Sequence, residues 1–246
     1  MQNLAWAEES ETLDKAFESA ARETATAEDE IEWRSEAQVG FLNSRGKTND
    51  RTFNGRVRIR AETPRWRNDS RAHFLHTRSD GKVTQEAFTA SHQTDYQWTQ
   101  QFYSLLFTGL QSDRFATFRY EYDLVGGLGY RVIRDVRQEW DLEAGLGGQY
   151  TERTGPPRET GFSPLGRLVS KYRQELGENL EFQQTLAYNF SQEVEDLRLY
   201  NSLAVKANKH LAVSLSYEWR RSVDQQNLVS SYDQITTLNL IYSWEP

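Results

Sequence analysis

Hydrophobic and polar residues alternate with a period of two along most of the chain. In segment 31–41 the odd-numbered positions are apolar or small, and the even-numbered positions up to 38 are Glu, Arg, Glu and Gln. Segment 53–61 repeats the pattern, with Val57 and Ile59 between arginines. Because successive side chains of a strand point to opposite faces, each segment is predicted to be a strand with one apolar and one charged face.

The alternation recurs down to the C-terminus. Further segments with one apolar face are 118–130, 140–150, 182–190, 199–207, 211–219 and 236–244. Residues 66–110 alternate less regularly, with Phe74, Phe88 and Tyr103 among their apolar anchors. The count is about twelve strands of about ten residues, a length that spans a bilayer when the strand is tilted.

The turn-rich stretches between these segments form two alternating classes. The longer class includes 43–50, 77–85 and 152–161, and the shorter class includes 63–68 and 134–137. Outer-membrane barrels have short periplasmic turns and longer outer loops, and an even strand count returns both termini to the periplasm. We therefore expect the longer class to face outward.

The same periodicity would fit a soluble sandwich or a soluble barrel with its charged face outside. Three features favour a membrane barrel. The strands are longer than the five or six residues usual in soluble sheets, and Gly145 and Gly147 lie within a charged face. The last segment ends in an alternation typical of a C-terminal assembly signal, with Leu238, Leu240, Tyr242 and Trp244.

Composition narrows the alternatives further. Of the 246 residues, 37% are hydrophobic and 26% are charged, and no apolar run reaches the roughly 18 residues of a transmembrane helix. The aromatic share of 13% is too high for a disordered acidic chain. Cys is absent, which excludes disulfides and Cys-based metal sites, and a net charge of -7 argues against nucleic-acid binding.

Six tryptophans fall near predicted strand ends or turns. An indole ring is half apolar and half polar, so this placement indicates an aromatic girdle at the membrane interfaces, although packing in a soluble β core would use tryptophan too. The predicted girdle residues are Trp33, Trp66, Trp98, Trp140, Trp219 and Trp244.

Residues 1–30 differ from the rest of the chain. They are rich in Glu, Ala and Thr with apolar residues at helical spacing, which predicts a short periplasmic segment, helical or disordered, before the barrel of residues 31–244. Ala5-Trp6-Ala7 has the small-x-small form of a signal cleavage site, but a charged and apolar leader is missing. We expect that the export signal has been replaced or shortened, the alternative being a chance tripeptide.

Segment 36–62 resembles the opening hairpin of the YdiY-like family of salt-induced outer-membrane proteins. Segments 120–132, 141–150, 215–220 and 236–244 follow in the order expected for that family. The resemblance covers Trp33 to Trp244, and Glu245 and Pro246 extend beyond the usual terminal aromatic residue. It implies a barrel of the Gram-negative outer membrane and no established activity.

The charged face, if it lines the lumen, carries both signs. The predicted lumen charges are Arg56, Arg58, Arg60, Arg119, Glu121, Asp123, Asp141, Glu143, Arg167, Lys171 and Arg173, and the acids from Glu121 to Glu143 are expected to adjoin. Opposed charges could select polar or charged solutes in a channel. They could equally pair off and plug the lumen, because twelve strands lie between filled eight-stranded barrels and open porins.

A catalytic centre is not indicated by any local motif. His73 and His76 are three apart and face opposite sides of a strand, no G-x-S-x-G occurs, and the glycines at 126–129 lie inside a strand pattern. We expect no catalytic residue, cofactor or metal, and a histidine clustered with Ser or Asp at the membrane surface would revive an enzyme hypothesis.

The sequence thus predicts an all-β, antiparallel up-and-down transmembrane barrel. Its first candidate function is passive, as a channel for small polar or charged solutes or an envelope-stress barrel. The alternative is a closed barrel that engages a protein partner through residues 1–30 or its outer loops. The expected partners are outer-membrane lipid and, through the C-terminal strand, the barrel-assembly machinery.

Overall fold

The computed structural model describes residues 31–45, 49–155, 159–225 and 229–244, so the predicted segment 1–30 lies outside the described residues. The strands are β1 (Glu32–Arg45), β2 (Asn49–Glu62), β3 (Trp66–Ser79), β4 (Lys82–Gln97), β5 (Phe102–Asp113), β6 (Phe118–Arg134), β7 (Gln138–Arg153), β8 (Thr160–Glu175), β9 (Leu180–Ser191), β10 (Val194–Lys206), β11 (Leu211–Asp224) and β12 (Val229–Trp244). Across those ranges, no helix is both long enough and apolar enough to cross a membrane.

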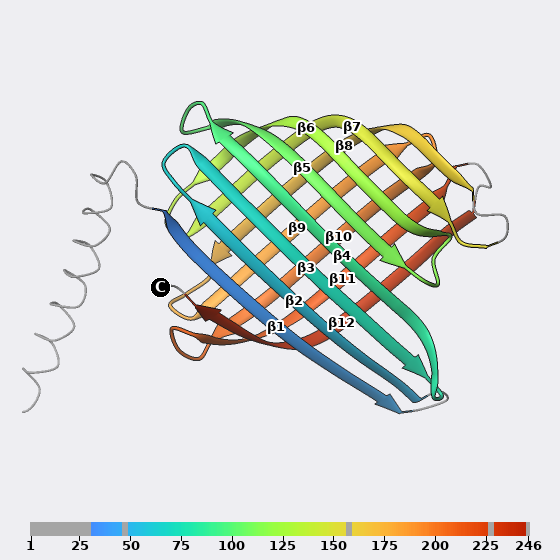
Figure 1. Cartoon of the computed structure of the whole chain (residues 1–246). Coiled ribbons are helices and arrows are strands. Elements are labelled where there is room, and N and C mark those ends of the chain that lie inside the picture. The colour runs from blue at the N-terminus through green and yellow to red at the C-terminus, as the bar shows by residue number, and fades with distance from the viewer. Residues whose placement is uncertain (1–30, 46–48, 156–158, 226–228, 245–246) are drawn as a thin grey trace, which may run out of the picture.

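Each strand pairs antiparallel with its neighbours in sequence, and β1 pairs with β12 to close the barrel (Figure 1). The closing seam runs from Ser35 opposite Trp244 to Gly40 opposite Asn239. The first strand therefore begins at the end of the barrel where the last strand finishes, here called the terminal end. The predicted twelve-stranded up-and-down barrel is confirmed.

The strands are longer than the sequence pattern indicated, at 12 to 17 residues. They continue into stretches expected to be outer loops, so the predicted contrast between long and short connections is wrong for the described strands. The β3–β4 connection shows why, since it is only the two-residue turn Asp80–Gly81. Both residues have positive φ, 49° and 80°, which suits a tight hairpin that follows the strand twist.

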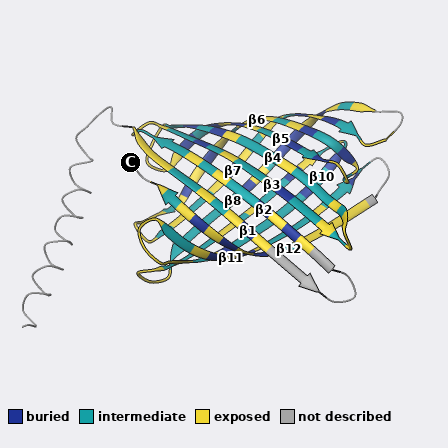
Figure 2. Ribbon diagram, turned by 60° about the horizontal axis from the view of Figure 1, so that its bottom comes forward, coloured by how far each residue is buried: buried dark blue, intermediate teal, exposed yellow. Residues whose placement is uncertain are grey.

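The apolar face of the sheet is outside and the charged face is inside. On β2, Val57 and Ile59 are 48% and 44% exposed, whereas Arg58 between them is half-buried. Figure 2 shows the resulting alternation of exposed and less exposed positions along the strands. Such an apolar exterior around a polar interior is the distribution of a membrane-spanning barrel and the reverse of a soluble one.

The predicted girdle tryptophans gather mainly at one end. Trp33 is the second residue of β1 and Trp66 begins β3. Trp98 follows β4, Trp140 is near the start of β7 and Trp244 ends β12, and all five positions belong to the terminal end. Trp219 is the exception, because it lies in the second half of β11, toward the far end of the barrel.

Glycines on the inner face of β6 and β7 allow these two strands to approach closely. A Cβ atom at Gly147 would overlap the Leu124 carbonyl oxygen and lie 2.7 Å from the Val125 Cα. A Cβ atom at Gly126, on the outer face, would meet nothing within 4 Å. The glycine at position 147 therefore permits a close contact between the backbones of β6 and β7.

This difference predicts opposite results for two Gly→Ala substitutions. Gly147→Ala should lower the free energy of unfolding by about 1–3 kcal/mol, because the added methyl group meets rigid backbone. Gly126→Ala is the matched control on the adjacent strand and should leave stability unchanged. Urea unfolding of the refolded barrel in lipid vesicles would measure both, and equal midpoints would contradict the close contact.

Candidate functional site

The enclosed lumen is lined by side chains from all twelve strands, and it is the candidate site. The register of the ladders places Arg56, Arg58 and Arg60 of β2 on the inner face, opposite Gln38, Glu36 and Arg34 of β1. The inner face also carries predicted residues from β6 (Glu121, Asp123), β7 (Asp141, Glu143) and β8 (Arg167, Lys171, Arg173).

Arg119 departs from the predicted lumen set. The β6–β7 register shifts between Phe118 and Tyr120, so Arg119 is the extra residue of a bulge. Its guanidinium lies 5.5 Å from the ring centroid of Tyr120, which stacks on the exposed Tyr122 of the outer wall. Because of the bulge, the buried Phe118 and not Arg119 faces Arg153.

The predicted acidic patch divides into two places. Antiparallel pairing puts Asp123 opposite Gln149 and Asp141 opposite Arg131. These two pairs are eight residues apart along each strand. The acids of β6 therefore lie toward the far end of the lumen, and those of β7 lie toward the terminal end.

Near the terminal end, Glu143 is the centre of a cluster that joins four strands. Its carboxylate lies 2.7 Å from Lys171 Nζ of β8, and it accepts hydrogen bonds from the Tyr103 hydroxyl of β5 (2.9 Å) and from Gln93 Nε2 of β4 (3.0 Å). Glu143 is buried, so each of these donors meets it away from bulk water. We call Gln93, Tyr103, Glu143 and Lys171 the Glu143 cluster.

A second acid, Asp69 on β3, binds neighbouring arginines. Arg58 Nη2 and Arg71 Nε lie 2.5 and 2.8 Å from its carboxylate oxygens. Next to it, Arg67 pairs with Asp95 of β4 at 2.7 Å and reaches Asp141 of β7 at 3.5 Å.

Toward the far end, Asp196 of β10 is the centre of the contacts that cross the lumen. Arg198 Nη2 and Arg220 Nη2 lie 2.7 and 2.6 Å from its Oδ2 atom. Arg198 also donates to Gln111 Oε1 of β5 at 2.6 Å, and Arg220 lies 3.6 Å from Glu121 Oε1 of β6. We call these five residues the Asp196 cluster.

The strands joined by the Asp196 cluster are almost diametrically opposed. In the twelve-strand ring, β5 and β10 are five strands apart, as are β6 and β11, and six is the largest possible separation. A contact between such strands can form only if the side chains meet across the lumen. The Asp196 cluster therefore bridges the lumen at this level.

Other inward side chains narrow the remaining space. Arg56 of β2 lies 2.6 Å from Glu218 of β11 and stacks over the Tyr200 ring of β10 at 4.8 Å. On the opposite wall, the Arg167 guanidinium lies 4.0 Å from the ring centroid of Phe107, within a buried apolar group that also includes Val125. A cavity of about 50 Å³ beside the Asp196 cluster has room for one or two water molecules.

The two ends of the lumen carry further ion pairs. At the terminal end Arg173 lies 3.1 Å from Glu139 and 3.5 Å from Glu181. At the far end Arg153 of β7 makes two hydrogen bonds, 2.7 and 3.0 Å long, to Asp224 of β11. Ion pairs thus occur at both ends of the lumen as well as in the Glu143 and Asp196 clusters, and each lowers the cost of burying its charges.

Comparison with known proteins assigns the family. A family model described as "Protein of unknown function, DUF481" matches residues 37–244. The chain belongs to the DUF481 family. The YdiY-like family indicated by the opening hairpin is the same family, so this prediction is confirmed. No curated protein matches the chain in sequence.

Solved barrels resemble this DUF481 chain only distantly. The translocator domain of the autotransporter NalP from Neisseria meningitidis is 10% identical, with a TM-score of 0.48, and the alignment covers 98% of this chain and 97% of that one. The NanC porin is 6% identical with a TM-score of 0.49, covering 88% and 100%. The KdgM porin is 10% identical with a TM-score of 0.46, covering 85% and 98%. The function of this DUF481 barrel has to be argued from its own residues.

Sequence reasoning missed the residues that bridge the lumen. Asp196, Arg198 and Arg220 lie just beyond the alternating segments 199–207 and 211–219, where the sequence pattern predicted no strand, although β10 and β11 extend over them. What sets them apart is a contact such as Arg198 to Gln111, 87 residues away. Such a pairing follows from barrel closure and not from any spacing along the chain.

The Asp196 cluster predicts that replacing Asp196 will strongly destabilise this DUF481 protein. Asp196→Ala would leave two half-buried guanidiniums without their shared acceptor, and we expect a loss of about 3 kcal/mol in unfolding free energy. Glu86→Ala is the control, since its pair with Arg114 is exposed and should contribute less than about 1 kcal/mol. Urea titration in lipid vesicles would compare them, and similar losses would show that the cluster is unimportant for stability.

Proposed function

We propose that the protein is an outer-membrane β-barrel whose lumen is closed by ion-paired side chains, and that its resting form is not an open diffusion pore. The observation that carries this proposal is the Asp196 cluster, in which Arg198 and Arg220 reach Gln111 and Glu121 across the lumen. Opening a path at this level requires buried charge pairs to separate, which costs several kcal/mol.

The proposed location rests on the outer wall. Apolar side chains such as Leu128, Leu146 and Leu215 are 64%, 75% and 54% exposed, and water would not favour so much apolar surface on a monomer. The tryptophans at the terminal end suit the boundary between hydrocarbon and headgroups. Barrels with an apolar outer wall and a polar interior are typical of outer membranes, which supports a location in the outer membrane of a Gram-negative bacterium.

A closed barrel acts through its surfaces. We infer a structural or interaction role in the envelope, with a protein partner reached through residues 1–30 or the connections at the far end. We also infer that the barrel-assembly machinery engages β12. In support, among the described residues β12 meets β1 over six register pairs, Ser35 to Gly40, but meets β11 over fourteen, so the seam is the weaker of its two ladders.

A channel for small ions or polar solutes is the second candidate. Two observations favour it. The barrier at the Asp196 cluster consists of side chains, which can rotate, and a small cavity already adjoins the cluster. Rotation of Arg198 and Arg220 would widen the path without moving the sheet. Glu121 and Asp196 would then line the opening and attract cations.

Conductance in a planar bilayer tests the closed lumen. The unaltered barrel should insert and carry little or no steady current, whereas the Arg198→Ala/Arg220→Ala double variant should conduct and prefer cations. Arg114→Ala, in the β5–β6 connection, is the matched control and should behave as the unaltered chain. Gel mobility before and after heating would confirm that every variant is folded.

A steady current through the unaltered barrel, with ion preference changed by an Arg58→Glu substitution, would establish the channel and refute the closed lumen. If the double variant folds and also fails to conduct, the Asp196 cluster is not the barrier, and the Glu143 cluster becomes the next candidate.

A further inference from the structure

Two arginines face each other on the outer wall near the far end of the barrel. Arg51 of β2 is directly opposite Arg78 of β3 in the ladder, and both side chains are exposed. Like charges in this position repel each other. Among the described residues, neither arginine has an ion pair, and their one hydrogen bond runs from Arg78 Nε to His76 Nε2 at 3.2 Å. The pair therefore keeps unused donors and an uncompensated charge.

The surrounding wall adds to this positive charge. Glu86 of β4 is opposite His76 on the same face, and its carboxylate already lies 3.6 Å from Arg114 Nη1 of the β5–β6 connection. Positive groups outnumber negative ones among the described residues at this end of β2 to β5, namely Arg51, Arg78, Lys82 and Arg114 against Asp80 and Glu86. An anion is the ligand that such a surface attracts.

The depth of the two arginines matches the headgroup layer of a membrane. Trp66, a girdle residue of the terminal end, begins β3, and Arg78 lies twelve residues further along that strand. At about 3.4 Å per residue and a strand tilt of about 40°, the separation is roughly 30 Å along the barrel axis. The apolar band of such a barrel is about 25 Å tall, so Arg78 lies just beyond the hydrocarbon on the far side.

Aromatic rings lie directly beneath the arginines. The Phe53 and Phe74 ring centroids are 6.4 Å apart, and the His76 ring stacks on Phe74 at 6.3 Å. Phe88 of β4 is opposite Phe74 in the ladder. The wall thus changes from charged to aromatic on passing from the headgroup layer into the hydrocarbon, as a lipid does where its headgroup meets its acyl chains.

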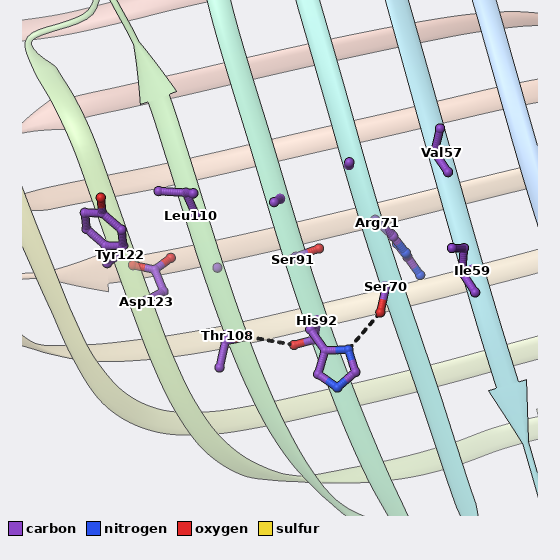
Figure 3. A pocket seen from close by; sticks show the side chains of 13 residues that line it. Val57, Ile59, Ser70, Arg71, Ser91, His92, Thr108, Leu110, Tyr122 and Asp123 are labelled. Atoms are coloured by element: carbon purple, nitrogen blue, oxygen red, sulfur yellow. Dashed lines mark hydrogen bonds between the residues drawn. The ribbon is translucent and has the colours of Figure 1, made fainter.

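Below the aromatic rings, the same strands form a hollow in the wall. It measures about 530 Å³ and lies over β2 to β6, with Val57 on one side and Leu110 on the other (Figure 3). The small side chains of Ala72 and Ala90, which pair between β3 and β4, lie between these larger ones. Ala72 is six residues from Arg78, so the hollow lies roughly 16 Å deeper, within the hydrocarbon.

The polar side chains beside the hollow bond to one another. The Ser70 Oγ atom lies 2.9 Å from His92 Nδ1, and His92 Nε2 lies 3.0 Å from Thr94 Oγ1. Thr94 Oγ1 donates to Asn68 Oδ1 at 2.9 Å. Figure 3 shows the His92 ring beside Ser70, with Thr108 on its other side. Because these groups have partners within the wall, an acyl chain suits the hollow better than a polar ligand does.

We propose that this part of the outer wall binds a lipid of the outer leaflet whose headgroup carries phosphate monoesters, the chemistry of lipid A. One phosphate lies between Arg51 and Arg78, and one acyl chain runs past Phe74 into the hollow. Guanidinium groups bind phosphate oxygens through paired, charge-assisted hydrogen bonds, so the phosphate turns the repulsion between the arginines into a shared attraction. Binding at this depth rests on the proposed outer-membrane location with both termini in the periplasm, and it is independent of the lumen.

Native mass spectrometry of the full chain, refolded in a neutral detergent and mixed with diphosphoryl lipid A, tests the proposal. We expect one bound lipid A per barrel, and an affinity lower by about tenfold or more in the Arg51→Gln/Arg78→Gln variant, because charge-assisted hydrogen bonds are lost. Lipid A stripped of both phosphates should bind the unaltered barrel just as weakly. Ala90→Phe, which fills the hollow, should also weaken binding, and an unchanged affinity would overturn the place of the acyl chain.

Arg221→Gln is the matched control for single charge removal and should be compared with Arg78→Gln. Arg221 is exposed near the far end of β11, over the Tyr232 ring and four strands from β3 around the barrel. Its replacement should leave the affinity unchanged, whereas Arg78→Gln should lower it. Equal affinity in the double variant, or for lipid A without phosphates, would overturn the proposal. So would displacement of lipid A by an equal concentration of inorganic phosphate, because the arginines would then recognise a free anion.

Heat-modifiable mobility shows that each variant is folded, and bilayer conductance of the same preparation separates the two proposals. A barrel that inserts, stays closed and binds no lipid A would overturn lipid binding alone. A barrel that carries a steady current and still binds lipid A through Arg51 and Arg78 would support lipid binding and refute only the closed lumen.

Discussion

Closure of the sheet is the constraint on which the rest of this structure depends. Once β1 pairs with β12, one face of every strand must point into the same narrow space. That face carries most of the charged residues, and burying them without partners would cost far more than the fold can supply. The Glu143 and Asp196 clusters satisfy this requirement, because each acid meets several donors drawn from different strands.

The strands and their inner faces could be predicted from the period of two, since that signal is local. The residues with which the charged side chains pair could not be predicted. Asp69 accepts from Arg58 of the adjoining strand, while Arg220 reaches Glu121 five strands away. The sequence around these residues indicates neither contact. Arg119 shows a second limit, because one bulge between Phe118 and Tyr120 is enough to change the side on which a residue lies.

The irregular stretch 66–110 illustrates the same limit on the outer face. Its weak alternation comes from Ser70, His92 and Thr108 at outward-facing positions, where Leu or Val would have made the strands obvious. Ser70 and His92 are 22 residues apart in the chain. Antiparallel pairing of β3 with β4 makes them direct neighbours, which no local spacing indicates.

The two polar systems of the barrel differ in a way that bears on function. In the lumen, Glu143 and Asp196 each have several donors, which stabilises one fixed, closed arrangement. On the outer wall, the chain from Asn68 through Thr94 and His92 ends at a single hydroxyl group. This outer chain of hydrogen bonds joins only the adjoining strands β3 and β4, so it adds to one ladder of the sheet and takes no part in closing the lumen.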